Sequence, residues 1–229
     1  MASPVLIPVM VLLYLQDRHS PFYIAERVGQ GDLPFRMVKL RSMIPDADKS
    51  GVDSTSSGDA RITPLGRFIR RHKLDEVSQL WNVIAGDMSL VGPRPNAQRE
   101  TDLYTDREKP LLSVKPGITD ISSIVFADEG EILRDSPDPD IDYNQLIRPW
   151  KSQLGLLYVE NQSLGLDLLL LLLTVLALLS RPQALQGVQK ILRRLSASQE
   201  LIQVCRRQDP LTPHPPPGSH RIVTARTSE

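Results

Sequence analysis

Two stretches of this chain are predominantly apolar, and each predicts a helix. The first run, Val5 to Leu15, follows Ser3-Pro4, a pair that suits the N-cap and first turn of a helix, so a helix is predicted from about Ser3 to Leu15. The second run, Leu164 to Leu179, is apolar on nearly every side. Both are shorter than the roughly 20 residues that span a bilayer. Two such runs in one chain favour helices that dip into or lie on a membrane over the alternative of two core helices.

Shorter strand and helix patterns lie between and beyond these runs. Residues 22–28 and 34–40 read as two strands, and the Gly-Gln-Gly-Asp turn between them predicts a β-hairpin. The pattern therefore predicts an α+β fold: a small helical domain with a short β-hairpin, an N-terminal membrane-dipping helix and C-terminal interfacial or amphipathic helices. The other predicted elements are helices at about 64–72, 75–86, 97–109, 143–155 and 182–205, a strand at 89–91, and loops at 45–60 and 128–142.

Charge is balanced over the whole chain but uneven along it. Lys and Arg together number 27, as do Asp and Glu, so no overall field draws the chain to nucleic acid. Residues 61–73 carry only cations, whereas residues 120–142 carry acids with Arg134 as the sole base. The basic segment suits phosphates or lipid headgroups, and the alternative is a solvated face. Cys205 is the single cysteine, which excludes a disulfide within one chain and a cysteine-based zinc site.

The candidate chemistry lies in a carboxylate pair and a group of arginines. Asp75 and Glu76 begin a predicted helix directly after Arg70 and Arg71, and Arg94 stands between Pro93 and Pro95 in a rigid corner. Carboxylates and phosphate oxygens are ligands that Mg²⁺ prefers, and arginine binds phosphate through two N–H groups. An aspartate can also attack phosphorus and form an acyl phosphate. The alternatives are a helix cap for the acids and a surface ion pair for the arginine.

Three long motifs resemble one known family. FYIAERVGQGDLPFRMVKLRSM, TPLGRFIRRHKLDEVSQLWNVIAGDMSLVGPRP and VKPGIT occur in the order typical of bacterial sugar transferases, the monotopic polyprenyl-phosphate phosphoglycosyl transferases. The resemblance covers about residues 3–119 and, more loosely, 156–181. It implies transfer of a sugar 1-phosphate from a UDP-sugar to polyprenol (undecaprenyl) phosphate, with release of UMP. The family does this at the cytoplasmic face of the bacterial inner membrane, and many surface glycans, including exopolysaccharides and O-antigens, begin this way.

The resemblance also implies roles for particular residues. Asp75 would be the nucleophile, forming a covalent aspartyl-phosphosugar intermediate, and also a ligand of Mg²⁺. Glu76 would be a second metal ligand or would accept a proton from the polyprenol phosphate. The remaining expectations are substrate binding by Arg70, Arg71, Lys39 and Arg41, a uridine phosphate site shaped by Pro93, Arg94 and Pro95, and the break of a re-entrant membrane hairpin at Ser3 and Pro4.

The chain departs from the family pattern in two places. The family's hairpin has an ascending half before its Ser-Pro break, whereas this chain starts at the break, so either translation starts upstream or one leg of the hairpin is present. After residues 115–119 the family usually continues with Gly and a Gln-Val-Asn-Gly-like segment. Here Asp120-Ile-Ser-Ser-Ile-Val-Phe and the acidic segment follow, which predicts an altered sugar pocket, so the donor sugar does not follow from the resemblance.

These features divide the chain into four predicted parts. They are a membrane-associated helix (1–20), a phosphoglycosyl transferase catalytic domain (21–180), a C-terminal helix (181–208) and a disordered Pro-rich tail (209–229). The expected partners are the UDP-sugar, the polyprenol phosphate and membrane lipid, and assembly as a homo-oligomer stays open. Two other functions remain: a truncated, non-catalytic family member that binds nucleotide sugar or scaffolds a glycan assembly complex, and a soluble metal-dependent binding module.

Overall fold

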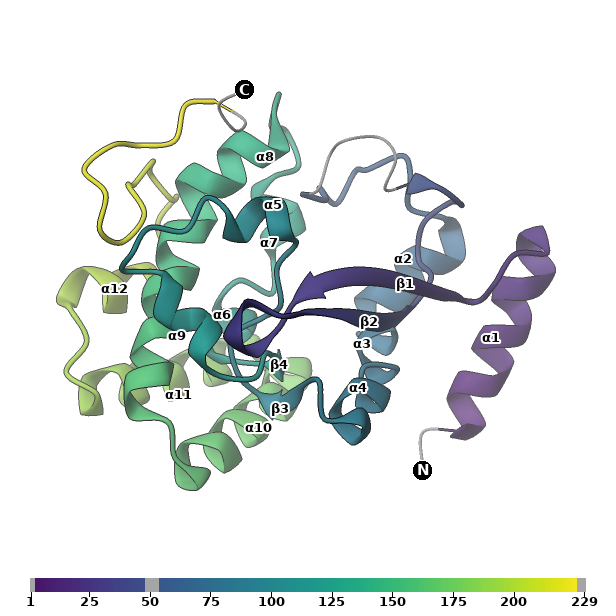
Figure 1. The fold of residues 1–229 in the computed structure, drawn as a ribbon, viewed down its shortest axis with the longest axis horizontal. Helices are drawn as coiled ribbons and strands as arrows, with labels where there is room; N and C mark the ends of the chain where they lie inside the picture. Colours follow the sequence, from purple (N-terminus) through teal and green to yellow (C-terminus); the bar gives the residue numbers. More distant parts are fainter. Residues whose placement is uncertain (1–2, 48–53, 226–229) are drawn as a thin grey trace.

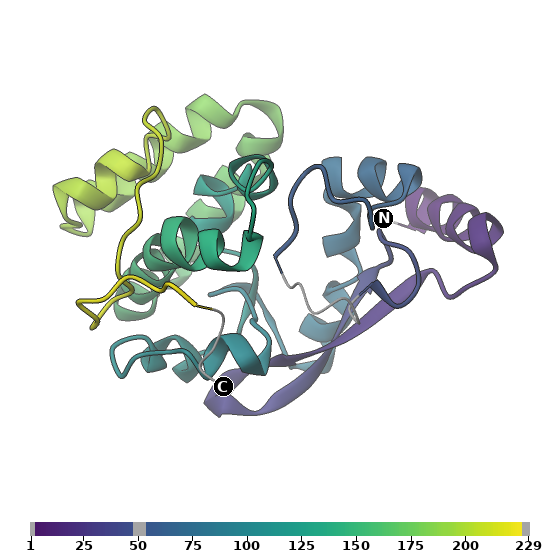
Figure 2. The ribbon, with the colours of Figure 1, turned by 90° about the horizontal axis from the view of Figure 1, so that it is seen from above.

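A long β-hairpin connects two groups of helices. The structure, a computed structural model, describes residues 3–47 and 54–225, and it confirms the α+β class. Figures 1 and 2 show α1 to α4 on one side of the molecule, α6 to α12 on the other, and the hairpin running from the first group to the second. A loop is expected at 45–60. Residues 54–60 of it have neither helix nor strand, and residues 48–53 lie outside the described residues.

The hairpin is confirmed at its predicted bounds. β1 (Phe22–Val28) pairs with β2 (Pro34–Leu40) in antiparallel register, from Phe22 opposite Leu40 to Val28 opposite Pro34. Gly31 adopts φ 71° in the turn, a left-handed conformation that glycine adopts without steric cost. At the turn end, the Val28 N–H donates to the Asn96 carbonyl at 2.9 Å. The hairpin is therefore bonded to a segment that precedes the second group of helices in the chain.

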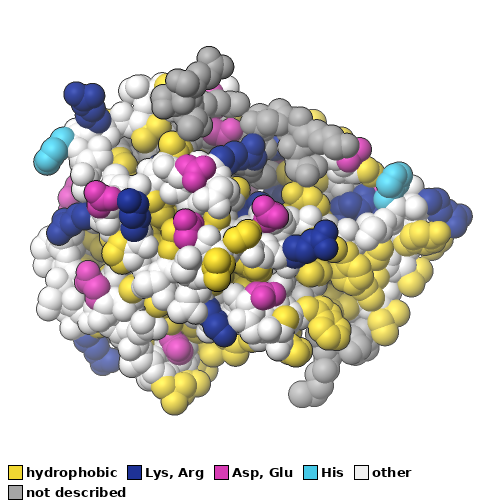
Figure 3. Space-filling model, viewed as in Figure 1, with side chains coloured by type: hydrophobic (Ala, Val, Ile, Leu, Met, Phe, Trp, Pro, Cys, Tyr) yellow, Lys and Arg dark blue, Asp and Glu magenta, His cyan; other side chains and the backbone are white. Residues whose placement is uncertain are grey.

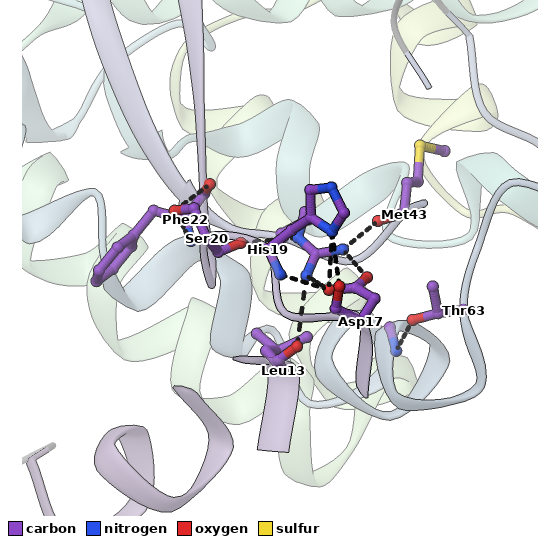
Figure 4. A network of polar contacts seen from close by, with 9 residues as sticks. Leu13, Asp17, His19, Ser20, Phe22, Met43 and Thr63 are labelled. Carbon is purple, nitrogen blue, oxygen red and sulfur yellow. Dashed lines mark hydrogen bonds and ion pairs between the residues drawn. The ribbon is translucent and has the colours of Figure 1, made fainter. Parts of the chain in front are cut away.

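Helix α1 (Ser3–Asp17) packs on the first group of helices and is held there by a buried arginine. Arg41, directly after β2, donates to both carboxylate oxygens of Asp17 at 2.6 and 2.7 Å and to the Ser20 carbonyl at 2.8 Å (Figure 4). Beside this pair, Leu13 is wholly buried in a small core that includes Leu40. The ion pair thus connects α1 to the hairpin.

Breaking this ion pair is expected to loosen α1 from the rest of the protein. Because Arg41 hydrogen-bonds the carboxylate, the pKa of Asp17 falls from 3.8 to about 2. A folded-state pKa below the unfolded value gives stability that is present above about pH 4 and is lost as the pH falls toward 2. Asp17→Asn should lower the free energy of unfolding at pH 7 by about 1.5–3 kcal/mol. Urea unfolding at pH 7 and at pH 3 in detergent measures both effects, with Asp106→Asn, at an exposed ion pair, as the control. An unchanged pH dependence in Asp17→Asn would contradict this role.

The second group of helices shares one large core. α10 (Leu164–Leu179) is confirmed at its predicted bounds, and it buries Leu166, Leu170 and Leu173 in this core while Leu172 and Leu179 are exposed. No helix in the described part of the chain is both long enough and apolar enough to cross a membrane. The other helices of the group are α6 (Ile121–Val125), α7 (Glu129–Ile132), α8 (Pro139–Asp142), α9 (Arg148–Asn161), α11 (Arg181–Arg194) and α12 (Gln199–Val204).

Several predicted helices are wrong in extent, and local side-chain bonds explain two of them. The helix expected at 97–109 is only α5 (Gln98–Thr101), because Thr105 and Glu108 cap a new turn: the Thr105 N–H donates to Glu108 Oε2 at 3.1 Å. The helix expected at 182–205 breaks before Ser198, whose Oγ accepts from the Leu201 N–H at 3.1 Å as the N-cap of α12. The helix expected at 143–155 begins with a π turn, and the acidic loop expected at 128–142 contains α7 and α8.

The segment after Asp209 has no helix or strand in its described part, residues 209–225. It is bonded to the middle of the π turn before α9 (Tyr143–Ile147). The His214 N–H donates to the Gln145 carbonyl at 3.0 Å, and Gln145 Nε2 donates to the Val223 carbonyl at 2.6 Å. The His214 ring also lies 4.4 Å from the ring of Trp150. This segment therefore covers part of the second group of helices.

Candidate functional site

A sharp turn between two helices places the carboxylate pair. α2 (Pro64–Arg71) is confirmed, with Thr63 Oγ1 accepting from the Gly66 N–H at 2.9 Å as its N-cap. Lys73 then adopts φ 55°, an uncommon left-handed conformation for a side chain with a Cβ. The turn starts a separate helix, α3 (Leu74–Val77), whose first turn holds Asp75 and Glu76. A four-residue helix has little macrodipole, so the charge on this pair is offset by side chains instead.

Hydrogen bonds from α3 and α4 (Leu80–Ala85) fix the pair beside β2. Ser78 Oγ donates to the Val38 carbonyl at 3.2 Å, and Asn82 Nδ2 donates to the Arg36 carbonyl at 2.7 Å. The Val38 N–H donates in return to Asn82 Oδ1 at 3.0 Å. The single helix expected at 75–86 is therefore two helices, since both side chains bond the strand across the break. This packing holds Asp75 beside Lys39 of β2.

Close backbone contact builds the corner that carries Arg94. β3 (Ser89–Val91), confirmed at its predicted bounds, pairs in parallel with β4 (Gly117–Thr119), and the Gly117 N–H donates to the Pro93 carbonyl at 2.9 Å. A Cβ on Gly117 would lie 2.1 Å from the Gly92 nitrogen, so only glycine fits here. The corner thus has a fixed path, and Arg94 Nη1 donates to the Ile118 carbonyl at 3.2 Å.

Arg94 joins this corner to the carboxylate pair. Its Nη1 lies 2.9 Å from Glu76 Oε1, and Lys73 Nζ lies 3.9 Å from the same oxygen. Burial alone would raise the pKa of Glu76, but Arg94, Lys73 and Lys39 lower it below its ordinary value. Glu76 in turn raises the pKa of Arg94. Both side chains therefore stay charged at neutral pH.

Asp75 has an unpartnered oxygen at the centre of this cluster. Its Oδ1 is buried, and no described residue hydrogen-bonds to it. Burial and the charge of Arg94 lower the pKa of Lys39 to about 8, while Asp75 and Glu76 oppose that fall. Arg70 donates through Nε to Ser42 Oγ at 2.8 Å; burial lowers its pKa, which the Asp75 carboxylate opposes. A buried carboxylate oxygen without a partner costs free energy, so the arrangement favours a bound group at Asp75.

The structure brings most of the predicted site residues together. Asp75, Glu76, Lys39, Arg70 and Arg94 act on one another electrostatically, and Pro93 and Pro95 form the corner on either side of Arg94.

Four other predicted site residues lie apart from this cluster in the described structure. Arg71 is exposed on α2, and no described interaction connects it with the acids. Arg41 is expected at the substrate, but its guanidinium is occupied by Asp17 and by backbone carbonyls. Ser3 and Pro4 begin α1.

The donor set at this site fits a magnesium ion. Mg²⁺ is commonly held in proteins by one or two carboxylates, with water and substrate phosphates as the other ligands. Asp75 and Glu76 supply two carboxylates, and the unpartnered Asp75 oxygen provides a free ligand atom. In the described parts of the chain no group of three or more His, Cys, Asp or Glu side chains could hold a metal. A metal at this site would therefore depend on substrate oxygens.

A buried glutamine near the acids was not found from the sequence. Gln79 is wholly buried one turn after Asp75, and neither its oxygen nor its nitrogen has a hydrogen-bond partner in the described structure. The sequence carries no signal for it, because the apolar residues of segment 77–84 keep a helical spacing that leaves Gln79 among the polar positions. An unpaired buried amide costs about 1–3 kcal/mol. Gln79→Met, which keeps the shape, should therefore raise the melting temperature in a thermal unfolding scan; a lower melting temperature would mean that the amide is hydrogen-bonded.

A pocket beside Arg94 was also missed. It is lined by Asp120 and Ser122 at the start of α6, by Tyr143, and by Lys151 of α9 as well as by Arg94 itself. These residues are far apart in the sequence, and no spacing rule connects them. The one signal in the sequence was the departure from the family pattern after residue 119, which predicts an altered sugar pocket.

The chain matches a family model and several curated proteins. Residues 1–181 match the model described as bacterial sugar transferase. A UDP-N-acetylgalactosamine-undecaprenyl-phosphate N-acetylgalactosaminephosphotransferase of Aeromonas hydrophila is 33% identical over 78% of this chain and 40% of its own length. A putative undecaprenyl-phosphate N-acetylgalactosaminyl 1-phosphate transferase of Bacillus subtilis is 43% identical, over 52% of this chain and 62% of its own. A UDP-glucose:undecaprenyl-phosphate glucose-1-phosphate transferase of Caulobacter vibrioides is 34% identical, over 65% and 58%. The chain thus spans about two fifths to three fifths of these relatives.

Proposed function

Because the chain belongs to the bacterial sugar transferase family, we propose that it transfers a sugar 1-phosphate from a UDP-sugar to polyprenol phosphate and releases UMP. The names of its relatives describe transfer of sugar phosphates to undecaprenyl phosphate, and two of those names specify a UDP-sugar donor. The product would begin a surface polysaccharide or glycoconjugate at the cytoplasmic face of the bacterial inner membrane. The observation that carries the proposal is the buried, unpartnered Oδ1 of Asp75 within a cluster of cations.

In the first step, a carboxylate oxygen of Asp75 attacks the β-phosphorus of the UDP-sugar. An O–P bond to Asp75 forms, the bond from the β-phosphorus to the bridging oxygen breaks, and UMP leaves with that oxygen and its electron pair. In the second step, an oxygen of the polyprenol phosphate attacks the phosphorus of the aspartyl-phosphosugar. The Asp75 O–P bond breaks, so the carboxylate is regenerated and polyprenol diphosphate sugar is formed. Two displacements replace one difficult step.

The neighbouring cations stabilise the charge of both displacements. Arg94 and Arg70 bind phosphate oxygens, and Lys39 adds a positive charge beside Asp75. Glu76 holds Arg94 in place through the 2.9 Å ion pair. Asp75 and Glu76 would hold Mg²⁺, which when bound neutralises charge on the diphosphate.

Exposed apolar side chains support the proposed membrane location. α1 exposes Ile7, Val11 and Leu15, and α4 exposes Trp81 and Ile84. Figure 3 shows hydrophobic side chains gathered over the side of the molecule that carries α1 and α4. A contiguous exposed apolar surface of this kind is typical of contact with a partner or a membrane. The substrate lipid would then reach the site without leaving the bilayer.

Polar substitutions on α4 are expected to weaken membrane binding. Trp81 is 66% exposed and Ile84 is 77% exposed, so replacing both with Ser should not disturb the core. Loss of their apolar contact, worth about 2–3 kcal/mol, should lower the vesicle-bound fraction severalfold in a flotation assay with anionic phospholipid vesicles. Leu33→Ser, on the equally exposed hairpin turn, is the control. Equal flotation of the double variant and wild type would exclude α4 from the membrane contact.

The proposed reaction is tested by UMP release from a panel of UDP-sugars with Mg²⁺ and polyprenol phosphate in detergent. Release of more than one UMP per protein that requires the lipid acceptor and the metal ion supports the transferase and identifies the donor. No release from any UDP-sugar, from a protein whose UMP binding is intact, would contradict it and favour a non-catalytic member that binds nucleotide sugar.

A further inference from the structure

A polar pocket adjoins the proposed reaction centre and has no role in the steps above. Arg94 is shared between the two, so the pocket begins where the β-phosphate of the donor would be held. Its other polar lining residues come from several segments that are far apart in the sequence. They include Asn96, Tyr104, Asp120, Ser122, Tyr143 and, on α9, Arg148, Lys151 and Ser152. The pocket thus combines aromatic rings with hydroxyl, amide, carboxylate and ammonium groups. Such groups can hydrogen-bond the hydroxyls of a polyhydroxylated ring.

The polar groups of this pocket are held in place. Asp120, only 2% exposed, accepts from Ser122 Oγ at 2.8 Å and from the Ser123 N–H at 2.7 Å. Lys151 forms an ion pair with Glu129 of α7, and its Nζ lies 5.2 Å from the centre of the Tyr143 ring. Burial raises the pKa of Tyr143, so its hydroxyl keeps its proton and can donate. Fixed donors and acceptors discriminate between ring hydroxyls better than mobile ones.

Each cation that lines this pocket already has a carboxylate partner. Arg94 is paired with Glu76 at 2.9 Å and Arg148 with the buried Glu108 at 2.8 Å, and Lys151 is paired with Glu129. With Arg94 also engaged by the donor phosphate, a sugar that carries a carboxylate would find Arg148 and Lys151 already paired and would approach the buried Asp120. The pairing therefore favours an uncharged ring.

The Glu129–Lys151 pair also belongs to the electrostatic surroundings of the reaction centre. Burial would raise the pKa of Glu129, but Lys151, Arg94 and Lys73 lower it. The second group of helices thus faces the cluster that α2, α3 and the corner build. A neighbouring pocket shares Arg94, Asn96 and Tyr104 with it. The residues that line only that second pocket are mostly apolar, so a hydroxyl-bearing ring has fewer partners there; they include Val28, Leu112, Val114, Pro95 and Pro116.

We propose that the pocket between Arg94 and α9 binds the sugar of the donor and selects an uncharged sugar over a uronic acid, with Ser122 and Lys151 as specificity-determining residues. This inference rests on the proposed function, because it assigns the ring attached to the phosphate that Asp75 attacks. The segment that supplies Asp120 and Ser122 is the one that departs from the family pattern.

Binding measurements by isothermal titration calorimetry test this assignment without turnover. The full chain in detergent is titrated with UDP-glucose, UDP-N-acetylgalactosamine, UDP-glucuronate and UMP. Wild type should bind at least one uncharged UDP-sugar about tenfold more tightly than UDP-glucuronate. Ser122→Ala and Lys151→Met should each weaken the binding of that UDP-sugar by about tenfold and change UMP binding by less than twofold. Lys109→Met, at an exposed ion pair outside the pocket, is the matched control.

Several outcomes would overturn the assignment. If the variants weaken UMP binding as much as UDP-sugar binding, the pocket binds the nucleoside. If wild type binds UDP-glucuronate as tightly as the uncharged UDP-sugars, the pocket does not select against a uronic acid. Because Lys151→Met leaves Glu129 without its partner, the double variant Glu129→Gln, Lys151→Met separates a folding effect from a binding effect. It should keep the wild-type melting temperature within a few degrees and still lose affinity for the UDP-sugar. If the protein distinguishes these UDP-sugars in binding but turns over none of them, the result contradicts the proposed function and leaves the pocket assignment standing.

Discussion

Asp75→Asn is expected to reduce UMP release by about a thousandfold or more, since the amide cannot form the acyl phosphate. The change is nearly isosteric, and the Ser78 Oγ bond to the backbone carbonyl of residue 75, at 3.0 Å, does not involve the side chain. The fold should therefore stay intact. Initial rates of UMP formation at saturating UDP-sugar measure the effect.

Two comparisons make the Asp75 result specific. Asp106→Asn, at an exposed carboxylate paired with Lys109, should keep the wild-type rate. UMP binding by Asp75→Asn should stay within a few-fold of wild type, because Arg94 and Arg70 still hold phosphate. A rate within tenfold of wild type in Asp75→Asn would mean that another group performs the displacement.

Arg94→Met is expected to give the second-largest loss, about 10²–10³-fold in kcat/KM. The change removes the cation that lies 2.9 Å from Glu76 and that the fixed corner holds beside Asp75. It also raises the pKa of Glu76, because burial raises this pKa and Arg94, its nearest cation, no longer lowers it. Arg94→Lys should recover part of the rate, because the charge returns without the planar donors.

Kinetics with Arg193→Met as the control test this prediction. Arg193 is exposed at the end of α11, far along the chain from the site, and its loss should change kcat/KM by less than twofold. The melting temperature of Arg94→Met separates folding from catalysis. A rate for Arg94→Met equal to that of Arg193→Met would exclude Arg94 from phosphate binding.

Patterns with local causes were predicted well. α10 begins and ends where its apolar run does, because Ser163 caps it and accepts from the Leu166 N–H at 3.3 Å. α2 follows from the Thr63-Pro64 start, and the hairpin follows from two strand-like segments joined by a glycine turn. In each case the residues that decide the element lie within it or next to it.

Features that depend on distant contacts were not predictable in this way. Nothing in the sequence around Lys73 indicates a left-handed residue, and this conformation is what separates α2 from α3. Arg41 lies in a segment beside the proposed site, yet Asp17, 24 residues earlier, holds its guanidinium. The Glu129–Lys151 pair joins two helices 22 residues apart. Side chains of this kind reach their partners only when the whole fold forms.

The central claim is that Asp75 carries the sugar phosphate between donor and acceptor, and intact-protein mass spectrometry tests it most directly. Wild type and Asp75→Asn are incubated with the UDP-sugar and Mg²⁺ without polyprenol phosphate. The proposed mechanism predicts a mass gain of one sugar phosphate in wild type alone, and its loss when polyprenol phosphate is added. A gain that persists in Asp75→Asn, or lipid product formed by wild type without any adduct on the protein, would contradict it.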